Sequence, residues 1–135
     1  TLGVRYFVNY WFFGANLNYA GDMYLSKAPL RQLMSNYITI NPYDPELYNA
    51  YQTLTQQEKF KNSATVDLSI GKILYLKDRK SINFNLAVNN VLNNKNIRTG
   101  GFENARFDIT APHKFDSKYY YMQGINCFMN VSYRF

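Results

Sequence analysis

The stretch Gly124-Ile125-Asn126-Cys127-Phe128-Met129-Asn130-Val131-Ser132-Tyr133-Arg134-Phe135 carries the clearest structural signal in the chain, because apolar and polar residues alternate along it. Val131, Tyr133 and Phe135 fall on one face of an extended strand and the residues between them on the other, since side chains alternate with period two. Such a strand either packs its apolar face on a core or turns that face to lipid. Its aromatic-rich end favours lipid, because Tyr and Phe form girdles at bilayer interfaces.

The composition agrees with a strand-rich protein. The chain has 135 residues and a net charge of +6, and 47% of its residues are apolar although its mean hydropathy is −0.39. The apolar content is largely Tyr and Phe interleaved with Asn, Ser and Lys, which favours strands and polar loops. Lys and Arg form no extended basic run, so we expect no nucleic-acid partner. No apolar stretch reaches the length of a transmembrane helix.

Alternation predicts five strands, at residues 2–8, 11–25, 64–76, 81–91 and 118–135. We expect a tight turn at Asn9-Tyr10 and a short turn at residues 77–80. Long loops cover residues 26–62 and 92–117, and Pro45 is placed to open a short helix in the first of them.

The lengths of these connections are informative. Short turns and long loops alternate, as they do in outer-membrane barrels with short periplasmic turns and long extracellular loops. Five strands are too few to close a barrel, and open sheet edges are not tolerated in lipid. The sequence therefore predicts an all-β fold, an antiparallel transmembrane β-barrel segment with two long extracellular loops. No signal sequence is recognisable, which would argue against a membrane location for a complete protein, so we expect this chain to be the C-terminal piece of a longer one.

Several segments resemble a known family. They are Tyr10-Trp11-Phe12-Phe13-Gly14-Ala15-Asn16-Leu17-Asn18-Tyr19, Tyr24-Leu25, Asp67-Leu68-Ser69-Ile70-Gly71-Lys72, Val88-Asn89-Asn90-Val91-Leu92-Asn93-Asn94-Lys95, Arg98-Thr99-Gly100-Gly101-Phe102-Glu103 and the closing strand to Phe135. In this order, and spanning nearly the whole chain, they resemble the C-terminal end of a TonB-dependent receptor of the Bacteroidetes type.

The resemblance implies a 22-stranded barrel with an N-terminal plug in the outer membrane of a Gram-negative cell, where it takes up a nutrient. It implies as partners outer-membrane lipid, the plug and remaining strands, the TonB complex through the N-terminal part that this sequence lacks, the barrel-assembly machinery and, in some receptors, a surface lipoprotein. It also implies that the assembly machinery recognises the terminal aromatic, with Val131, Tyr133 and Phe135 as the signal.

Two further groups are candidate sites. If the apolar face meets lipid, the polar face lines a lumen, where the candidate residues are Asn16, Asn18, Asp67, Asn83, Asn85, Asn126 and Asn130. They contact plug or substrate, or simply keep a polar face solvated. The first long loop holds the aromatic candidates Tyr37, Tyr43, Tyr48 and Tyr51. Exposed aromatics there would stack on sugars or pack on a partner, and the alternative is packing within the loop.

No catalytic or cofactor signature is recognisable in the sequence. His113 is the single histidine, too few for a typical zinc site, and no nucleophile–base arrangement or phosphate-binding loop is seen. We therefore expect no enzyme activity, metal or cofactor. Besides the receptor, two functions stay open: a structural or adhesive outer-membrane β-protein that binds partners through its loops, and a soluble antiparallel β-sheet binding module.

Overall fold

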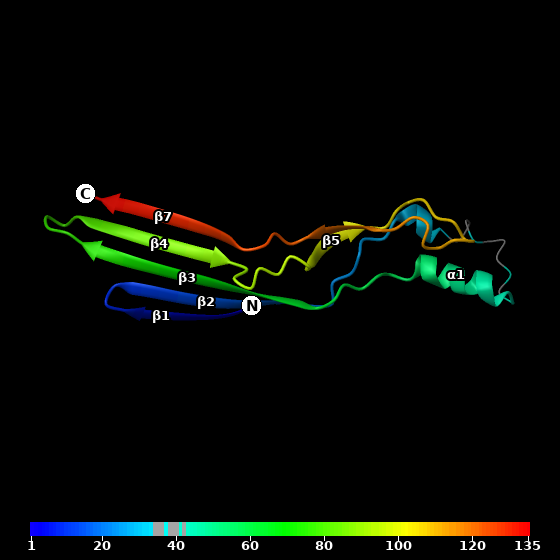
Figure 1. The fold of residues 1–135 in the computed structure, drawn as a ribbon, viewed down its shortest axis with the longest axis horizontal. Helices are drawn as coiled ribbons and strands as arrows, with labels where there is room; N and C mark the ends of the chain where they lie inside the picture. Colours follow the sequence, from blue (N-terminus) through cyan, green and yellow to red (C-terminus); the bar gives the residue numbers. More distant parts are fainter. Residues whose placement is uncertain (34–36, 38–40, 42) are drawn as a thin grey trace. The chain divides into compact units, whose positions relative to one another are not determined.

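Five antiparallel strands form one continuous sheet in the computed structural model, which describes residues 1–33, 37, 41 and 43–135. They are β1 (Leu2–Val8), β2 (Trp11–Ala20), β3 (Ser63–Tyr75), β4 (Ser81–Asn89) and β7 (Asn126–Arg134), and they lie side by side in the order β1-β2-β3-β4-β7 (Figure 1). The sheet is open, with β1 and β7 at its edges. The antiparallel all-β prediction is confirmed for this part of the chain.

The chain divides into two units, each of which is described by itself. The first comprises Thr1–Gly21, Asn62–Ile97 and Met122–Phe135 and contains the five-stranded sheet. The second comprises Asp22–Lys61 and Arg98–Tyr121. The second unit is thus built from the two connections that leave the same end of the sheet.

Both predicted tight turns of the sheet are present. Asn9 and Tyr10 have φ angles of 47° and 65°, and the two-residue hairpin between β1 and β2 needs positive φ at both positions. Asp78 and Arg79, with φ of 63° and 61°, make the turn between β3 and β4. Turns with two such left-handed residues match the right-handed twist of the flanking strands, so each turn fixes the register of its hairpin.

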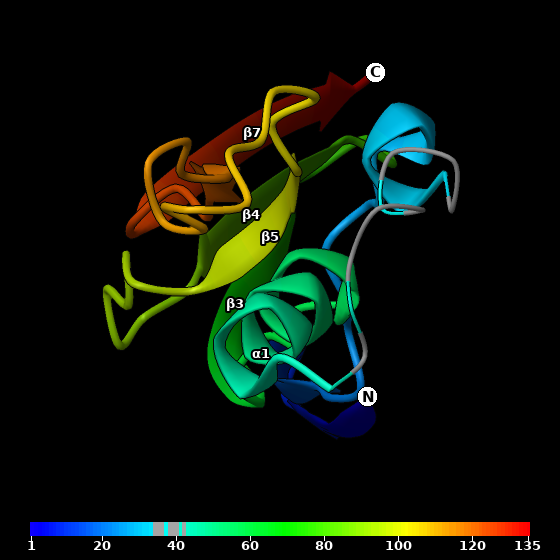
Figure 2. The same ribbon diagram turned by 90° about the vertical axis from the view of Figure 1, so that its right-hand side faces the viewer.

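The second unit has a small apolar core and contains both helices and strands. It contains a 3-10 helix η1 (Pro29–Gln32), the helix α1 (Pro45–Thr55) and a two-stranded sheet of β5 (Arg98–Phe102) and β6 (Lys118–Tyr121). Figure 2 shows α1 nearly end-on. Among the residues of this unit that the structure describes, the buried apolar side chains are Leu25, Tyr37, Leu54 and Phe60.

Helix α1 begins where the sequence predicts. Pro45 occupies the first turn, where its missing N–H costs nothing. The Asp44 carboxylate caps the helix by accepting from the backbone N–H groups of Glu46, at 3.0 Å, and Leu47, at 3.3 Å. The helix prediction is confirmed, and the residue that caps it is now identified.

The predicted second strand was too long. It was expected over residues 11–25 but ends at Ala20, because Asp22 takes a left-handed φ of 54° that breaks the extended backbone. Leu25 then lies in the core of the second unit with 1% of its surface exposed. The expected strands at 64–76 and 81–91 are present as β3 and β4, with ends shifted by one or two residues.

The final predicted strand and the second long loop also need correction. Residues 118–135 form two strands, because β6 pairs with β5 while β7 pairs with β4. The loop expected over residues 92–117 contains β5, which the sequence analysis missed. Between β6 and β7, Gly124 lies directly against the side chains of Asn93 and Lys95, so a side chain at that position would clash.

Candidate functional site

The five-stranded sheet has one apolar face that nothing in the described structure covers. The register places the following residues on it, which we call the apolar face: Leu2, Val4, Tyr6 and Val8 of β1; Trp11, Phe13, Ala15, Leu17 and Tyr19 of β2; Ala64, Val66, Leu68, Ile70, Lys72 and Leu74 of β3; Ile82, Phe84, Leu86 and Val88 of β4; and Cys127, Met129, Val131 and Tyr133 of β7. Val4 is 65% exposed at one edge and Met129 62% at the other. An exposed apolar surface this wide marks a contact with protein or lipid.

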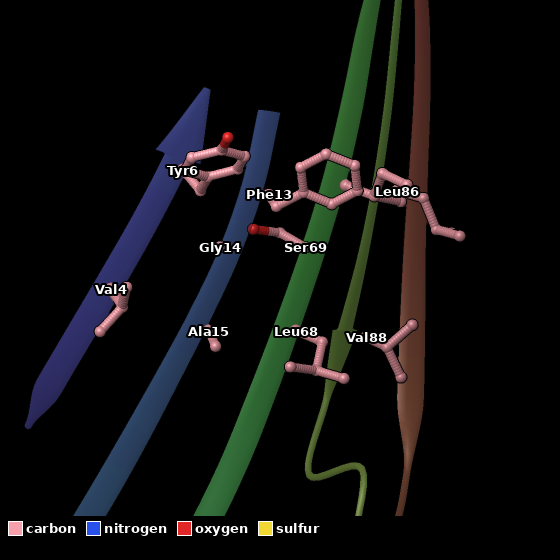
Figure 3. A pocket seen from close by; sticks show the side chains of 10 residues that line it. Val4, Tyr6, Phe13, Gly14, Ala15, Leu68, Ser69, Leu86 and Val88 are labelled. Atoms are coloured by element: carbon pink, nitrogen blue, oxygen red, sulfur yellow. The ribbon is translucent and has the colours of Figure 1, made fainter. Parts of the chain in front are cut away.

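The middle of the apolar face is hollowed. Val4, Ala15, Leu68 and Val88 form one row across four strands, with Ala15 the smallest member, and Tyr6, Phe13 and Leu86 belong to the next row (Figure 3). These rows border an open apolar hollow of about 400 Å³.

Aromatic residues and one lysine mark the turn end of the sheet. The rings of Tyr10 and Tyr75 meet edge-on with 5.1 Å between centroids. Lys72 lies on the apolar face, yet its ammonium reaches the turn, 4.7 Å from the Trp11 ring centroid and 3.0 Å from the Asn9 carbonyl oxygen to which it donates. Lysines commonly place their aliphatic stem along an apolar surface and keep the charged end at its edge. Sequence analysis did not single out these contacts of Lys72.

The opposite face, called the polar face, carries the lumen-facing candidates. The register places all seven on it, namely Asn16, Asn18, Asp67, Asn83, Asn85, Asn126 and Asn130. Asn89 and Asn126 bond across β4 and β7 at 3.0 Å, and Asn85 donates to Asn83 at 3.3 Å. The candidates thus share one face, while their contact with plug or substrate stays a prediction.

A hydrogen-bond network joins the polar face to the loop end of the sheet. Asp67 accepts from the Asn18 amide at 2.6 Å and from the Asn90 backbone N–H at 2.8 Å. Asn90 is 4% exposed, and its side chain donates to the carbonyls of Asn94 and Gln123 and accepts from the Asn94 N–H. Asn90 therefore ties together three separate segments. The sequence showed it only as one asparagine among many.

The loop aromatic candidates are only partly available for binding. Tyr37 is 4% exposed and packs against Tyr51, with 5.0 Å between centroids, and against Phe107, at 5.4 Å. Burial raises the pKa of the Tyr37 hydroxyl, which donates to the Arg31 carbonyl at 2.7 Å. Tyr48 lies beside Tyr51, whereas Tyr43 is 91% exposed. Packing within the loop thus accounts for Tyr37, whereas Tyr43 and, at 44% exposure, Tyr48 remain accessible at the surface.

A carboxylate holds the second unit together. Glu58 accepts from the Arg98 guanidinium at 2.6 Å and from the Tyr119 hydroxyl at 2.8 Å, while Arg98 stacks 3.9 Å from the Tyr119 ring centroid. Burial, and then the neighbouring Glu58 carboxylate, raise the pKa of the Tyr119 hydroxyl. Glu58, in the connection from α1 to β3, therefore anchors the strands β5 and β6.

Two of the three residues predicted as an assembly signal, Val131 and Tyr133, lie on the apolar face of β7. Val131 and Tyr133 are both more than half exposed, and the Tyr133 ring lies 6.2 Å from that of Phe135. Phe135 follows the last strand residue directly and is 93% exposed. The register places Val131 and Tyr133 on one face, while Phe135 lies beyond the paired residues, so its place on that face and recognition by an assembly machinery stay predictions.

Comparison of the chain with protein-family models, curated proteins and solved structures finds no match. The fold defines an antiparallel, mainly β protein with a two-faced sheet. Within the residues that the structure describes, no cluster of three potential metal ligands occurs, and no helix is long and apolar enough to cross a membrane.

Proposed function

We propose that this chain is the C-terminal barrel portion of a TonB-dependent outer-membrane receptor, which takes up a nutrient into a Gram-negative cell. The observation that carries the proposal is the uncovered apolar face, which is five strands wide and backed by a hydrogen-bonded polar face. In water such a face is unfavourable, whereas lipid solvates it without cost.

Two further features support the same function. Each strand of the sheet has 7 to 13 residues, which brackets the length of about 9–11 residues that a tilted strand needs to span a bilayer. The aromatic residues and the ammonium of Lys72 gather at the turn end, where a membrane interface would lie. In this proposal the apolar face meets lipid and the polar face meets the plug. The long connections are extracellular, and the N-terminal part of the protein engages the TonB complex.

Cysteine labelling of the full-length protein in isolated outer membranes tests the proposal. In a Cys127→Ser background, Met129→Cys and Asn130→Cys place a thiol on neighbouring residues of opposite faces. We expect a charged, water-soluble maleimide to label position 130 but not 129, and a lipid-soluble maleimide to label position 129. Equal labelling of both positions by the water-soluble reagent would overturn the membrane assignment and favour a soluble sheet.

A further inference from the structure

The positive charge of the chain is concentrated in the first unit. This unit carries seven Lys and Arg residues against two acidic ones, whereas the second unit carries eight against seven. Five of the seven lie toward the turn end of the sheet, and they are Lys72, Lys77, Arg79, Lys80 and Arg134. Among the described residues no ion pair involves any of these five, and Asp78 is the single acidic residue between Leu68 and the end of β4. The turn end therefore attracts anions.

The two hairpins of the sheet end at different levels, which creates a step at this end. Trp11, the first residue of β2, pairs with Lys72, whereas β3 continues to Tyr75, which pairs with Ser81. The turn between β3 and β4 accordingly extends past the turn between β1 and β2 (Figure 1). The Lys72 ammonium lies at the shorter turn, and residues 77–80 carry three more cations at the tip of the longer hairpin.

The apolar hollow begins beside Lys72. Ile70 lines the hollow and precedes Lys72 by two positions on the same face of β3. Phe13, which also lines it, follows Trp11 by two positions on the same face of β2. The cation and the hollow are thus neighbours on one face, an arrangement that matches a molecule with an anionic head and a hydrocarbon chain.

The neighbouring cation and hollow decide between kinds of ligand. A phosphate ester without hydrocarbon chains would pair with the cations but leave the hollow uncovered, and an uncharged lipid would cover the hollow but leave the cations unpaired. Lys72 belongs to a face that is otherwise apolar, so at the edge of a lipid layer its charge needs a counter-ion. The phosphate of an anionic lipid head group supplies that counter-ion where the hydrocarbon ends.

We propose that the turn end of the sheet binds an anionic phospholipid, with its phosphate at the Lys72 ammonium and one acyl chain in the apolar hollow. The cations of residues 77–80 attract the head group from the solvent side. This inference rests on the proposed function, which places the apolar face in lipid, and it adds the class of lipid and the place where it binds.

Native mass spectrometry of the full-length protein in detergent tests the inference. The probes are phosphatidylglycerol, phosphatidylethanolamine with the same acyl chains, and glycerol phosphate. We expect the first bound phosphatidylglycerol to be held more tightly than phosphatidylethanolamine, and glycerol phosphate not to bind at the same concentrations. Lys72→Met keeps an unbranched stem but removes the charge, and should weaken phosphatidylglycerol binding about fivefold, the effect of one basic residue at an anionic lipid surface. Ala15→Leu fills the hollow and should weaken the binding of both lipids.

The matched control is Lys95→Met, which removes a lysine charge from the segment that follows the opposite end of β4 in the same unit. It should retain the parent preference for phosphatidylglycerol. The inference is overturned if the parent binds both lipids equally, if glycerol phosphate binds as tightly as the lipid, or if either Lys72→Met or Ala15→Leu binds as the parent does.

The cysteine labelling described above separates this inference from the membrane proposal, because it uses positions 129 and 130 of β7 and no added lipid. Face-specific labelling combined with equal binding of the two lipids would defeat the lipid site alone. Labelling of both positions by the water-soluble reagent would defeat the membrane proposal and the lipid site together.

Discussion

At the scale of single residues, Asn90 shows what the sequence can and cannot tell. Asparagine is one of the few residues that readily adopts a left-handed backbone, and Asn90 has a φ of 50°. A turn after β4 was therefore foreseeable. Its bonds to Asn94 and Gln123 were not, because Gln123 approaches only after the chain has passed through the second unit. Burial of a polar hub depends on such distant neighbours.

Two replacements of Asn90 separate the contribution of its side-chain hydrogen bonds to stability from that of its left-handed backbone. Asn90→Gly keeps the left-handed backbone but leaves buried carbonyl and N–H groups without partners, and should lower the free energy of unfolding by about 1–3 kcal/mol. Asn90→Ala adds the left-handed strain of an L-residue, about 1 kcal/mol more. Unfolding in denaturant, followed by tryptophan fluorescence, measures both. Equal stability of the parent and Asn90→Gly would show that the side-chain bonds contribute nothing.

Asp108 gives a pH dependence with a definite sign. The Lys114 ammonium at 2.7 Å, and then the hydroxyl and N–H of Thr110, lower the pKa of the Asp108 carboxyl to about 2 from 3.8. Between these two pKa values the unfolded chain therefore binds more protons than the folded chain. The ionised Asp108 carboxylate stabilises the folded state fully at pH values above 3.8, and this stabilisation is lost as the pH falls toward 2.

The destabilisation caused by Asp108→Asn should accordingly be largest at neutral pH and vanish near pH 2. Unfolding temperatures of parent and variant across that range measure it, and carbon-detected NMR titration of the Asp108 carboxyl gives the pKa directly. A pKa at the ordinary value of 3.8 would contradict the contact with Lys114.

At the scale of elements, the period-two alternation of apolar and polar residues correctly predicted the positions of strands that have one apolar face. It located β1, β3, β4 and β7 because each contributes to the apolar face. It failed for β5, where Gly100 and Gly101 offer no alternation, and it did not separate β6 from β7. The Tyr-rich β6 is as strand-prone as β7, and only its pairing with β5 shows that the two are distinct.

The two faces of β7 predict opposite responses to one substitution. Met129→Lys places a charge on the apolar face and should cost about 2–4 kcal/mol if that face lies in lipid. Asn130→Lys, on the polar face, should leave assembly unchanged. Heat-modifiable mobility of the full-length protein from outer membranes reports assembly. Similar assembly of both variants would argue against lipid on the apolar face.

The turn between β3 and β4 offers a stabilising change. Arg79 has a φ of 61°, a conformation that an L-residue adopts at a cost and glycine adopts freely. Arg79→Gly creates the Asp-Gly pair that this hairpin turn prefers, and should raise the free energy of unfolding by about 0.5–1 kcal/mol. Lys77→Gly, just before the left-handed pair, is the control and should not stabilise. Denaturant titration compares the two variants.

At the scale of the whole molecule, the candidate sites differ in how far the sequence revealed them. The polar-face residues follow from alternation alone, since one strand register places them all. The proposed lipid site around Lys72 does not, because it joins the turn between β1 and β2 to a lysine of β3, which the chain reaches only after passing through the first part of the second unit. Which separate segments meet is set by long-range packing, and local sequence patterns do not encode it.

Counting strand directions gives one more consequence. Neighbours in the sheet alternate, so β1 and β7 at its two edges run the same way. If this sheet closed on itself, or if copies joined around a ring axis, each seam would pair β7 with β1 in parallel. An antiparallel barrel that contains the sheet therefore needs an odd number of further strands between those edges. The parity of the strand count thus disfavours a closed ring of identical copies, because each seam of such a ring would pair parallel strands.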